Sequence, residues 1–307
     1  MRALVLIVLS ALGCASGDHG SVSTPVETRS LLGEDLRRPS LPPDLHRQRV
    51  EELTAAEAGF ERNPEDPDAL IWVGRRLAYL GRYNDAIETF SRGIALHPDD
   101  PRMYRHRGHR WITLRQFDRA VEDLTRATVL MEGRPDQIEP DGLPNSRGIP
   151  TSSLHSNVWY HLALAHYLRG EYEIAAPAWE RARAALDNPD NLVAASHWLY
   201  MTLRRLGRDA DADAVLDPIK TDLDVIENHA YHRLLLMYRG ETSPERLLGS
   251  EGTALDDVTT GYGVGNWYLY NGDPARARAI FETIVATDQW AGFGYIAAEA
   301  EVARSSH

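Results

Sequence analysis

The sequence predicts an all-α fold in which pairs of helices stack into an elongated solenoid. The stretch 68–100 contains two runs whose apolar residues recur at helical spacing, and Gly81 stands between them where a left-handed helix C-cap is expected. Such a pair cannot bury its apolar stripes within itself, so it must stack on further copies. The flanking sequence supplies copies, because the breaker NPEDP at 63–67 returns as HPDDP at 97–101, 34 positions later.

Equivalent positions of successive copies carry residues of the same kind. The aligned pairs of the first two copies are Gly74 and Gly108, Leu77 and Trp111, Tyr83 and Phe117, Ala86 and Ala120, Phe90 and Leu124, and Gly93 and Ala127. Small residues at close helix crossings and aromatic residues where helices interlock resemble the tetratricopeptide repeat family, whose period is about 34 residues. The resemblance implies a right-handed superhelical solenoid of about six repeats with capping helices.

The solenoid domain is expected to span residues 44–307, with a capping helix at each end. The first, over 44–63, has Asp44 as a candidate N-cap. Its buried side is expected to consist of Leu45, Val50, Leu53, Ala56 and Phe60. The last, over 290–304, covers the final repeat. One departure from the pattern stands out, because Arg115 occupies the inter-helix position of the second copy, where the first copy has glycine.

The N-terminal residues 1–13 have the features of a signal peptide. Arg2 precedes the apolar run ALVLIVLSAL, which is too short to span a bilayer as a mature helix. The run leads into ALGC at 11–14, which resembles the lipobox of bacterial lipoproteins. The resemblance implies that Cys14 carries a lipid, and that Ala15 in place of Asp favours the outer membrane. Cys14 is the only cysteine, so no internal disulfide can form. The alternative is an ordinary secretory signal with an incidental cysteine.

Two stretches lack helical periodicity. Residues 14–43 contain the cysteine and are rich in Gly, Ser, Thr and Pro, so they are expected to form a flexible tether. Residues 132–156, between the second and third copies, contain four prolines and three glycines. An irregular connection of this length is uncommon inside a repeat array, and it is expected to be a lid, a binding loop or a disordered insertion.

The distribution of charge bears on the class of ligand. The formal net charge of −12 argues against nucleic acid as a partner. The resemblance to tetratricopeptide repeats implies that the first helix of each pair lines a concave face, where arginine, histidine and large aromatic residues dominate. The predicted groove residues are Trp72, Arg75, Arg102, Arg105, His106, His109, Asn157, Tyr160, His161, His197, Trp198 and Arg205, with Trp72 and Trp198 as stacking anchors.

Arginine forks and aromatic rings suit a ligand that carries carboxylates or phosphates. We therefore expect a scaffold or adaptor of the bacterial envelope, lipid-anchored at the outer membrane and facing the periplasm, that binds a protein, a peptide or another anionic ligand in its groove. Binding of an anionic glycan, in polysaccharide export or wall assembly, is a second hypothesis. The sequence has no recognised catalytic motif and predicts no cofactor, so an enzyme is not expected.

The histidines leave a third hypothesis open. His106 and His109 lie three positions apart on one helix face, and His229 and His232 repeat the spacing. Such pairs can chelate zinc or copper together with a further ligand, which would suit a metal-dependent enzyme. A separate hypothesis concerns pH. Histidines with a pKa near about 6.5 would gain charge on acidification and strengthen the binding of anions.

Overall fold

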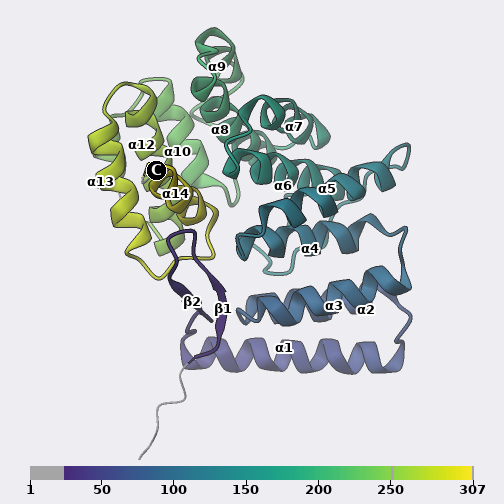
Figure 1. Ribbon diagram of the computed structural model, residues 1–307. Coiled ribbons are helices and arrows are strands. Elements are labelled where there is room, and N and C mark those ends of the chain that lie inside the picture. Colours follow the sequence, from purple (N-terminus) through teal and green to yellow (C-terminus); the bar gives the residue numbers. More distant parts are fainter. Residues whose placement is uncertain (1–23, 250–251, 306–307) are drawn as a thin grey trace, which may run out of the picture.

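The computed structural model describes residues 24–249 and 252–305, most of which are helical (Figure 1). The strands are β1 (Val26–Arg29) and β2 (Asp35–Arg37), and the helices are α1 (Pro43–Arg62), α2 (Pro67–Tyr79), α3 (Tyr83–Leu96), α4 (Pro101–Thr113), α5 (Phe117–Met131), α6 (Leu154–Leu168), α7 (Tyr172–Ala185), α8 (Pro189–Arg205), α9 (Asp209–Val215), α10 (His229–Tyr238), α11 (Pro244–Leu248), α12 (Ala254–Tyr270), α13 (Pro274–Val285) and α14 (Phe293–Arg304). From α2 to α13 the helices pack as consecutive antiparallel pairs, so the predicted all-α helical-repeat solenoid is confirmed.

The first repeat shows why the sequence folds in this way. The Asp66 side chain accepts a hydrogen bond from the Asp68 amide and caps α2, whose first residue is proline. The helix ends before Gly81, whose φ of +72° is a conformation that glycine adopts readily. Gly74 lies so close to the Phe90 ring that a Cβ there would overlap it, and this contact lets α2 and α3 cross closely. The glycine and aromatic positions of the repeat are therefore packing positions.

The array bends back on itself toward the C-terminus. The second helices of the fourth and fifth pairs are short, since α9 has seven residues and α11 has five. Helices α10 to α14 lie opposite α2 to α4, with the β-hairpin between the two groups (Figure 1). The N-terminal hairpin and the C-terminal helices consequently enclose the inner side of the array. In an open solenoid this side would face solvent.

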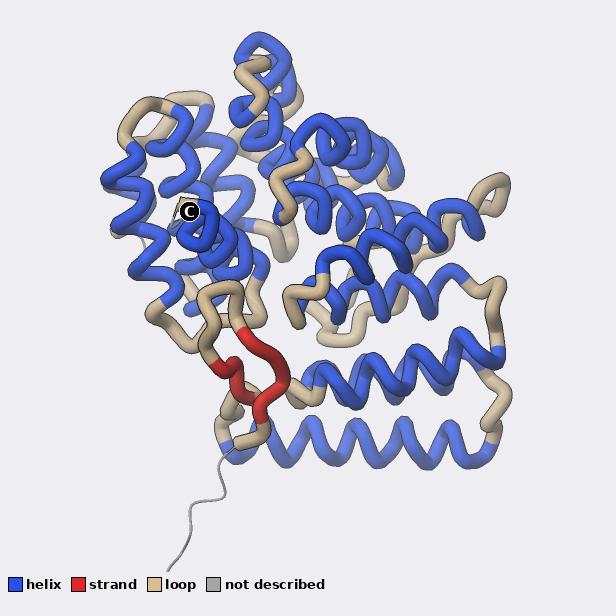
Figure 2. Tube along the Cα trace, viewed as in Figure 1, coloured by secondary structure: helices blue, strands red, loops and turns tan. Residues whose placement is uncertain are grey.

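The β-hairpin is a correction to the predicted flexible tether over 14–43. Strands β1 and β2 pair antiparallel and lie against the helices (Figure 2). The Thr28 hydroxyl donates to the Leu114 carbonyl, and the Trp290 indole donates to the Arg37 carbonyl. Leu36 is buried in the main hydrophobic core. The tether prediction is therefore wrong for residues 24–43, while residues 1–23, including Cys14, lie outside the described residues.

The first capping helix begins one residue earlier than expected. Its N-cap position is Pro42 and has no side-chain hydrogen bond, so Asp44 lies in the first turn and is not the cap. Leu53 is buried as predicted, but Val50 is 39% exposed. The reason is that α1 covers one side of α2 only, which leaves a narrower apolar stripe. Among residues 24–249 and 252–305, no helix combines the length and apolar character that crossing a membrane requires.

A buried ion pair between Arg115 and Glu299 joins the second repeat to the last helix, α14. Arg115 Nε donates to Glu299 Oε2 at 2.8 Å, and the side chains are 3% and 0% exposed. The same guanidinium donates to the Trp290 carbonyl, and Glu299 also accepts from the Leu31 amide of the hairpin. Arg115 has a φ of +62°, the backbone conformation that glycine has in the first repeat. Arg115, which replaces the inter-helix glycine of the repeat, thus places its guanidinium where it can hold the last helix, α14.

Replacing Glu299 by alanine should destabilise the protein by about 3–5 kcal/mol, because it leaves a buried guanidinium without its counter-charge. The free energy of unfolding in urea measures this loss. The exposed pair Arg278 and Glu282 on α13, whose side chains are 52% and 51% exposed, provides the control. Glu282→Ala should change stability by less than about 1 kcal/mol. Equal effects of the two substitutions would show that the closure does not depend on Glu299.

Candidate functional site

A cavity of about 280 Å³, here called the central cavity, lies on the inner side of the array between α4, α6, the start of α8 and α10. Its lining residues are Arg105, His109, Thr151, Ser152, Ser156, Asn157, Tyr160, His161, Asp190, Asn191, Ala194, Asn228, Tyr231 and Phe293. Five of the predicted groove residues belong to this set, namely Arg105, His109, Asn157, Tyr160 and His161. The inner helices thus bring together the middle part of the predicted groove.

The irregular segment 133–153, here called the strap, crosses the inner side next to this cavity. At one end, Arg75 Nη1 donates to the Pro140 carbonyl at 2.8 Å, and Arg76 Nη1 donates to the Gly142 carbonyl at 3.0 Å. The other end is held near the start of α10, where Asn145 Nδ2 donates to Glu227 Oε1 at 2.7 Å. Helix α6 begins at Leu154, so it takes the last three residues of the predicted stretch 132–156. The strap is therefore an ordered connection fastened at both ends.

Glu139 of the strap is paired with Arg105, one of the arginines that were predicted to bind an anionic ligand. Arg105 Nη2 lies 2.8 Å from Glu139 Oε2, and Asn157 Nδ2 donates to the same oxygen at 2.9 Å. Both members of the ion pair are buried, and burial raises the pKa of Glu139 and lowers that of Arg105. Arg105 Nε and Glu139 Oε1 have no hydrogen-bond partner. The pair is therefore incomplete, because a guanidinium and a carboxylate can form two parallel hydrogen bonds.

Positive charge exceeds negative charge around Arg105. Arg75 acts on Arg105 and on Arg110, and the buried carboxylate Glu139 opposes Arg105 and Arg75. Burial lowers the pKa of Arg110 to about 10. Its guanidinium lies 5.6 Å from the Tyr83 ring centroid and forms no ion pair with the residues that the structure describes. This cluster of arginines makes an inner cationic centre in a protein of net charge −12.

The two histidines of the cavity, His109 and His161, and the neighbouring His106 are neutral. Burial and the neighbouring arginines lower the pKa of His106, His109 and His161 well below the usual value. The His109 and His161 rings lie 4.3 Å apart, and His161 Nδ1 donates to the Asn157 carbonyl at 2.6 Å. The hypothesis that these histidines become protonated on mild acidification is therefore wrong, because burial and the positive charge of nearby guanidinium groups disfavour a charged imidazole.

The fourth copy does not contribute to the cavity as predicted. His197 and Trp198 are 0% and 1% exposed and lie in the core, so Trp198 is not a stacking anchor. Arg205 forms an ion pair with Glu301 of α14 at 3.0 Å. The physical reason is the closure of the array, since α10, α12 and α14 cover the face of α8 that an open solenoid would leave in solvent.

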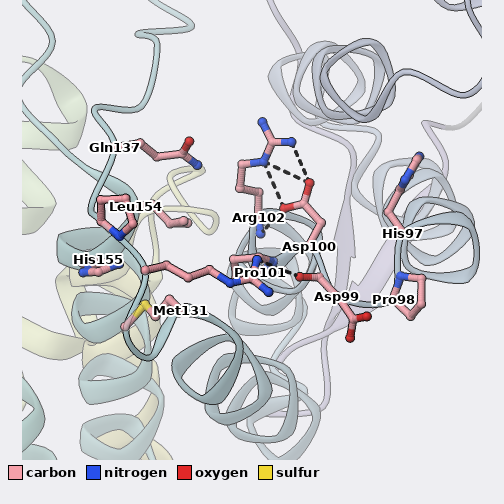
Figure 3. A pocket seen from close by; sticks show the side chains of 12 residues that line it. His97, Pro98, Asp99, Asp100, Pro101, Arg102, Met131, Gln137, Leu154 and His155 are labelled. Atoms are coloured by element: carbon pink, nitrogen blue, oxygen red, sulfur yellow. Dashed lines mark hydrogen bonds and ion pairs between the residues drawn. The ribbon is translucent and has the colours of Figure 1, made fainter.

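Besides Arg75, which holds the strap and does not line the central cavity, three predicted groove residues of the first two copies lie elsewhere. Trp72 is half-buried, and the guanidinium groups of Arg75 and Arg76 lie over its ring, at 4.6 and 5.1 Å from the centroid. Arg102 lines a separate hollow of about 640 Å³ near the start of α4, where it is paired with Asp100 (Figure 3). It also forms an ion pair with Asp68. His106 is buried and stacks on Phe90 at 5.3 Å. None of the three lines the central cavity.

No group of three His, Cys, Asp or Glu residues within 24–249 and 252–305 is placed to hold a metal ion. His106 Nδ1 lies 2.9 Å from a nitrogen of Arg105, and His232 Nε2 donates to the Lys220 carbonyl at 2.8 Å. One nitrogen of each ring is thus already engaged. Neither candidate pair, His106 with His109 or His229 with His232, belongs to a group of three such ligands among these residues.

Several residues of the site were not predicted from the sequence, among them Arg110, Glu139, Tyr231 and Phe293. Arg110 lies four positions after His106 and so on the same side of α4, a signal that could have been used. Glu139 lies in a segment without periodicity, and nothing in its neighbourhood announces a partner on α4. Tyr231 and Phe293 reach the cavity only because the array closes, which the repeat pattern does not encode.

Comparisons with known proteins agree with the repeat. Residues 67–109, which cover α2, α3 and much of α4, match the family described as Tetratricopeptide repeat. No curated protein matches. Similar solved structures include YrrB, described as a TPR protein with an unusual peptide-binding site, at 14% identity and a TM-score of 0.44, covering 77% of this chain and 93% of that chain. PilW, a type IV pilus biogenesis factor, is 15% identical with a TM-score of 0.45, covering 79% and 86%. MamA is 15% identical with a TM-score of 0.43, covering 66% and 100%.

Gly142→Ala should loosen the strap. A Cβ at this position would overlap the Tyr79 hydroxyl and lie 2.6 Å from Arg75 Nη2, so the strap or these side chains must move. We expect faster cleavage within residues 133–153 by a protease at low concentration, with a small loss of global stability. Gly59→Ala on α1 is the control, because its Cβ would meet only the Arg62 side chain at 3.9 Å. An unchanged cleavage rate in Gly142→Ala would mean that the contacts of Arg75 do not hold the strap.

Stability should fall on acidification because of the buried histidines. The pKa of His197 is lowered to about 3 by burial, so below about pH 6.5 the unfolded chain binds a proton that the native state does not. The stability contribution of each such histidine is complete above about pH 6.5. It decreases by up to about 1.4 kcal/mol per pH unit below that value.

Urea unfolding at about pH 7.5, 6.5 and 5.5 measures the slope. In His197→Phe the slope between the lower two values should decrease by about the share of one histidine, up to about 1.4 kcal/mol per pH unit. Glu139 and the other histidines are common to both proteins, so the difference isolates His197. An identical slope would contradict the neutral state of this ring.

Proposed function

We propose that this protein is a binding scaffold or adaptor whose central cavity receives an anionic group, a carboxylate above all, from a protein or other ligand. The observation that carries the proposal is a cluster of positive charge on the inner side of the array, since Arg105 and Arg75 both act on the buried carboxylate Glu139 and Arg110 lies close enough to act on both arginines. Buried charges without balanced partners are unfavourable, and they occur preferentially at functional sites. Helical-repeat arrays are also typical binding architectures.

The cavity offers a specific way to hold a carboxylate. Arg105 can donate through Nε, which has no partner, as well as through Nη2. Asn157 Nδ2 adds a neutral donor on the opposite side. A ligand carboxylate that takes both guanidinium donors would form the bidentate geometry that Glu139 lacks. Binding is then an exchange, in which the ligand replaces Glu139 and the strap shifts.

Glycan recognition has less support than this exchange. Sugar rings pack on exposed aromatic faces, but Trp198 is buried and two guanidinium groups lie over the ring of Trp72. Tyr160 and Phe293 remain at the cavity. Their rings already contact each other and the neighbouring histidines, with centroids 5.3 to 6.3 Å apart where Phe293 is involved. The aromatic groups of the site are thus walls of a pocket and not an open platform.

The anchor is a further part of the proposal and rests on the sequence alone. The apolar run before Cys14, and its resemblance to a lipobox, support a lipid on Cys14 and a place at the outer membrane, facing the periplasm. Residues 14–24 can span at most about 35 Å when fully extended. Since the hairpin begins at Val26, the folded array would stay close to the lipid surface. Its ligand would then be another component of the envelope.

Capture from detergent-solubilised envelopes, followed by mass spectrometry, tests the binding function. The key variant is Arg105→Gln/Glu139→Gln, which removes both charges and keeps hydrogen-bonding groups. It should lose about 2–5 kcal/mol of binding free energy for an anionic ligand. Glu139→Gln alone should bind more tightly than the native protein, because the internal competitor has lost its charge.

Arg102→Gln is the matched control, since Arg102 is also an α4 arginine paired with carboxylates but lies outside the central cavity. All variants are first compared by circular dichroism. If the double variant and the native protein capture the same ligands equally well, the cationic centre is not a receptor.

A further inference from the structure

A second and larger cavity adjoins the central cavity. This apolar crevice, of about 760 Å³, lies between β2 and the segment that follows it, the start of α3, the start of α12 and the loop before α14. Its apolar lining includes Leu36, Leu41, Leu255, Trp290 and Phe293. Leu255 is 53% exposed and stands at the mouth of the crevice. An apolar hollow of this size in an acidic protein is a candidate ligand site.

The two cavities share one wall. His109, Tyr231 and Phe293 line both of them. The His109 and Phe293 rings lie 5.3 Å apart, and the Tyr231 hydroxyl is 3.2 Å from that of Tyr160. All of these side chains are uncharged or, for His109, held neutral by a lowered pKa. A ligand that extends from Arg105 toward the crevice therefore passes between apolar or neutral rings.

We propose that the central cavity and the apolar crevice together bind one amphiphilic carboxylate, an unbranched alkyl-chain acid of the fatty-acid class. The head would lie between Arg105 and Asn157, and the chain would pass His109, Tyr231 and Phe293 into the crevice. The inference rests on the proposed function for its anion site and adds the chemical class of the ligand.

The polar groups at the edge of the crevice favour an alkyl chain over a peptide. These groups are paired among themselves: Arg38 with Glu27, Arg37 with Asp35, and Gln289 with Asp288. A peptide would bring an amide and a carbonyl with each residue, and every one of them needs a partner when buried. An alkyl chain needs none, and its burial against Leu36, Leu41 and Trp290 is favourable in itself. Charge complementarity with Arg105 places the carboxylate end of the ligand in the central cavity and leaves the alkyl chain for the crevice.

Calorimetric titration of the full chain with saturated carboxylates of about six to sixteen carbons, below their micelle concentrations, tests the inference. Affinity should increase by about fourfold for each added CH₂ until the crevice is full, and then stop increasing. Alcohols of the same lengths should bind more weakly, because they lack the charge. In Arg105→Gln/Glu139→Gln the carboxylates should bind no better than the alcohols.

Leu255→Glu probes the crevice without a core substitution. It places a carboxylate at the mouth, in the first turn of α12, where helices accept acidic residues. Long-chain affinity should fall at least about tenfold, as expected for excluding two or more CH₂ groups, while short-chain affinity is unchanged. Ile174→Glu is the matched control, since Ile174 is also 53% exposed, lies in the first turn of α7 and lines neither cavity.

The outcomes separate this inference from the proposed function. Binding that depends on Arg105 but not on chain length would overturn the alkyl ligand and leave the anion site. Chain-length dependence that Leu255→Glu does not alter would place the chain elsewhere and also overturn it. If a protein is captured in an Arg105-dependent way and no carboxylate of any length binds, the scaffold proposal is kept and the proposed amphiphilic ligand is refuted. If neither proteins nor carboxylates depend on Arg105, both proposals fail.

Discussion

The ion pair between Arg115 and Glu299 is the constraint on which the rest of the structure depends. Its carboxylate is fully buried and joins three parts of the chain, since it accepts from the guanidinium of the second repeat and from the Leu31 amide of the hairpin while belonging to α14. A repeat array without such a contact would leave its inner side open to solvent. Here the pair holds α14 against the turn between α4 and α5, so that Phe293 reaches the central cavity and Trp290 reaches the crevice. The site is therefore a product of closure.

The strap is a second closure, made from the inside. Arg75 and Arg76 of α2 donate to two of its carbonyls, and Asn145 of the strap donates to Glu227, just before α10. The strap therefore connects the first helices of the array to the later helices, and the pair of Arg115 and Glu299 also connects these two groups. The two closures differ in their energetics. The Arg115 pair is buried with several partners, whereas most contacts of the strap are single hydrogen bonds at partly exposed residues. Opening of the strap is consequently the easier motion, and it is the motion that a ligand of the cavity requires.

The repeat could be predicted from the sequence because it depends on local patterns. Gly74, Phe90 and Gly81 each mark a crossing or a turn within one helix pair, and the spacing of 34 residues carries them to the next pair. The hairpin could not be predicted, since its strands have four and three residues and are stabilised by helices far along the chain. Within the site, Arg105, His109, Asn157, Tyr160 and His161 on α4 and α6 were predicted from the resemblance to tetratricopeptide repeats, which implies that these positions face inward. Those that arrive through closure or through the strap, such as Phe293 and Glu139, were not, because long-range contacts leave no periodic signal.

The incomplete pairing of Glu139 with Arg105 explains how a buried site can still exchange its occupant. Arg105 Nε and Glu139 Oε1 lack partners, and each unsatisfied buried group costs about 1–3 kcal/mol. The closed state is thus less stable than the same ion pair would be with two parallel hydrogen bonds. A carboxylate that enters with better geometry recovers part of that free energy, and this gain offsets the release of the strap. The neutral histidines fit the same scheme, because a charged imidazole beside Arg105 and Arg110 would add repulsion without adding a donor in the required place. Apart from Asp190, whose carboxylate accepts from three backbone amides before α10, the site combines a strongly cationic group with uncharged walls. This arrangement favours an anionic head attached to an apolar body.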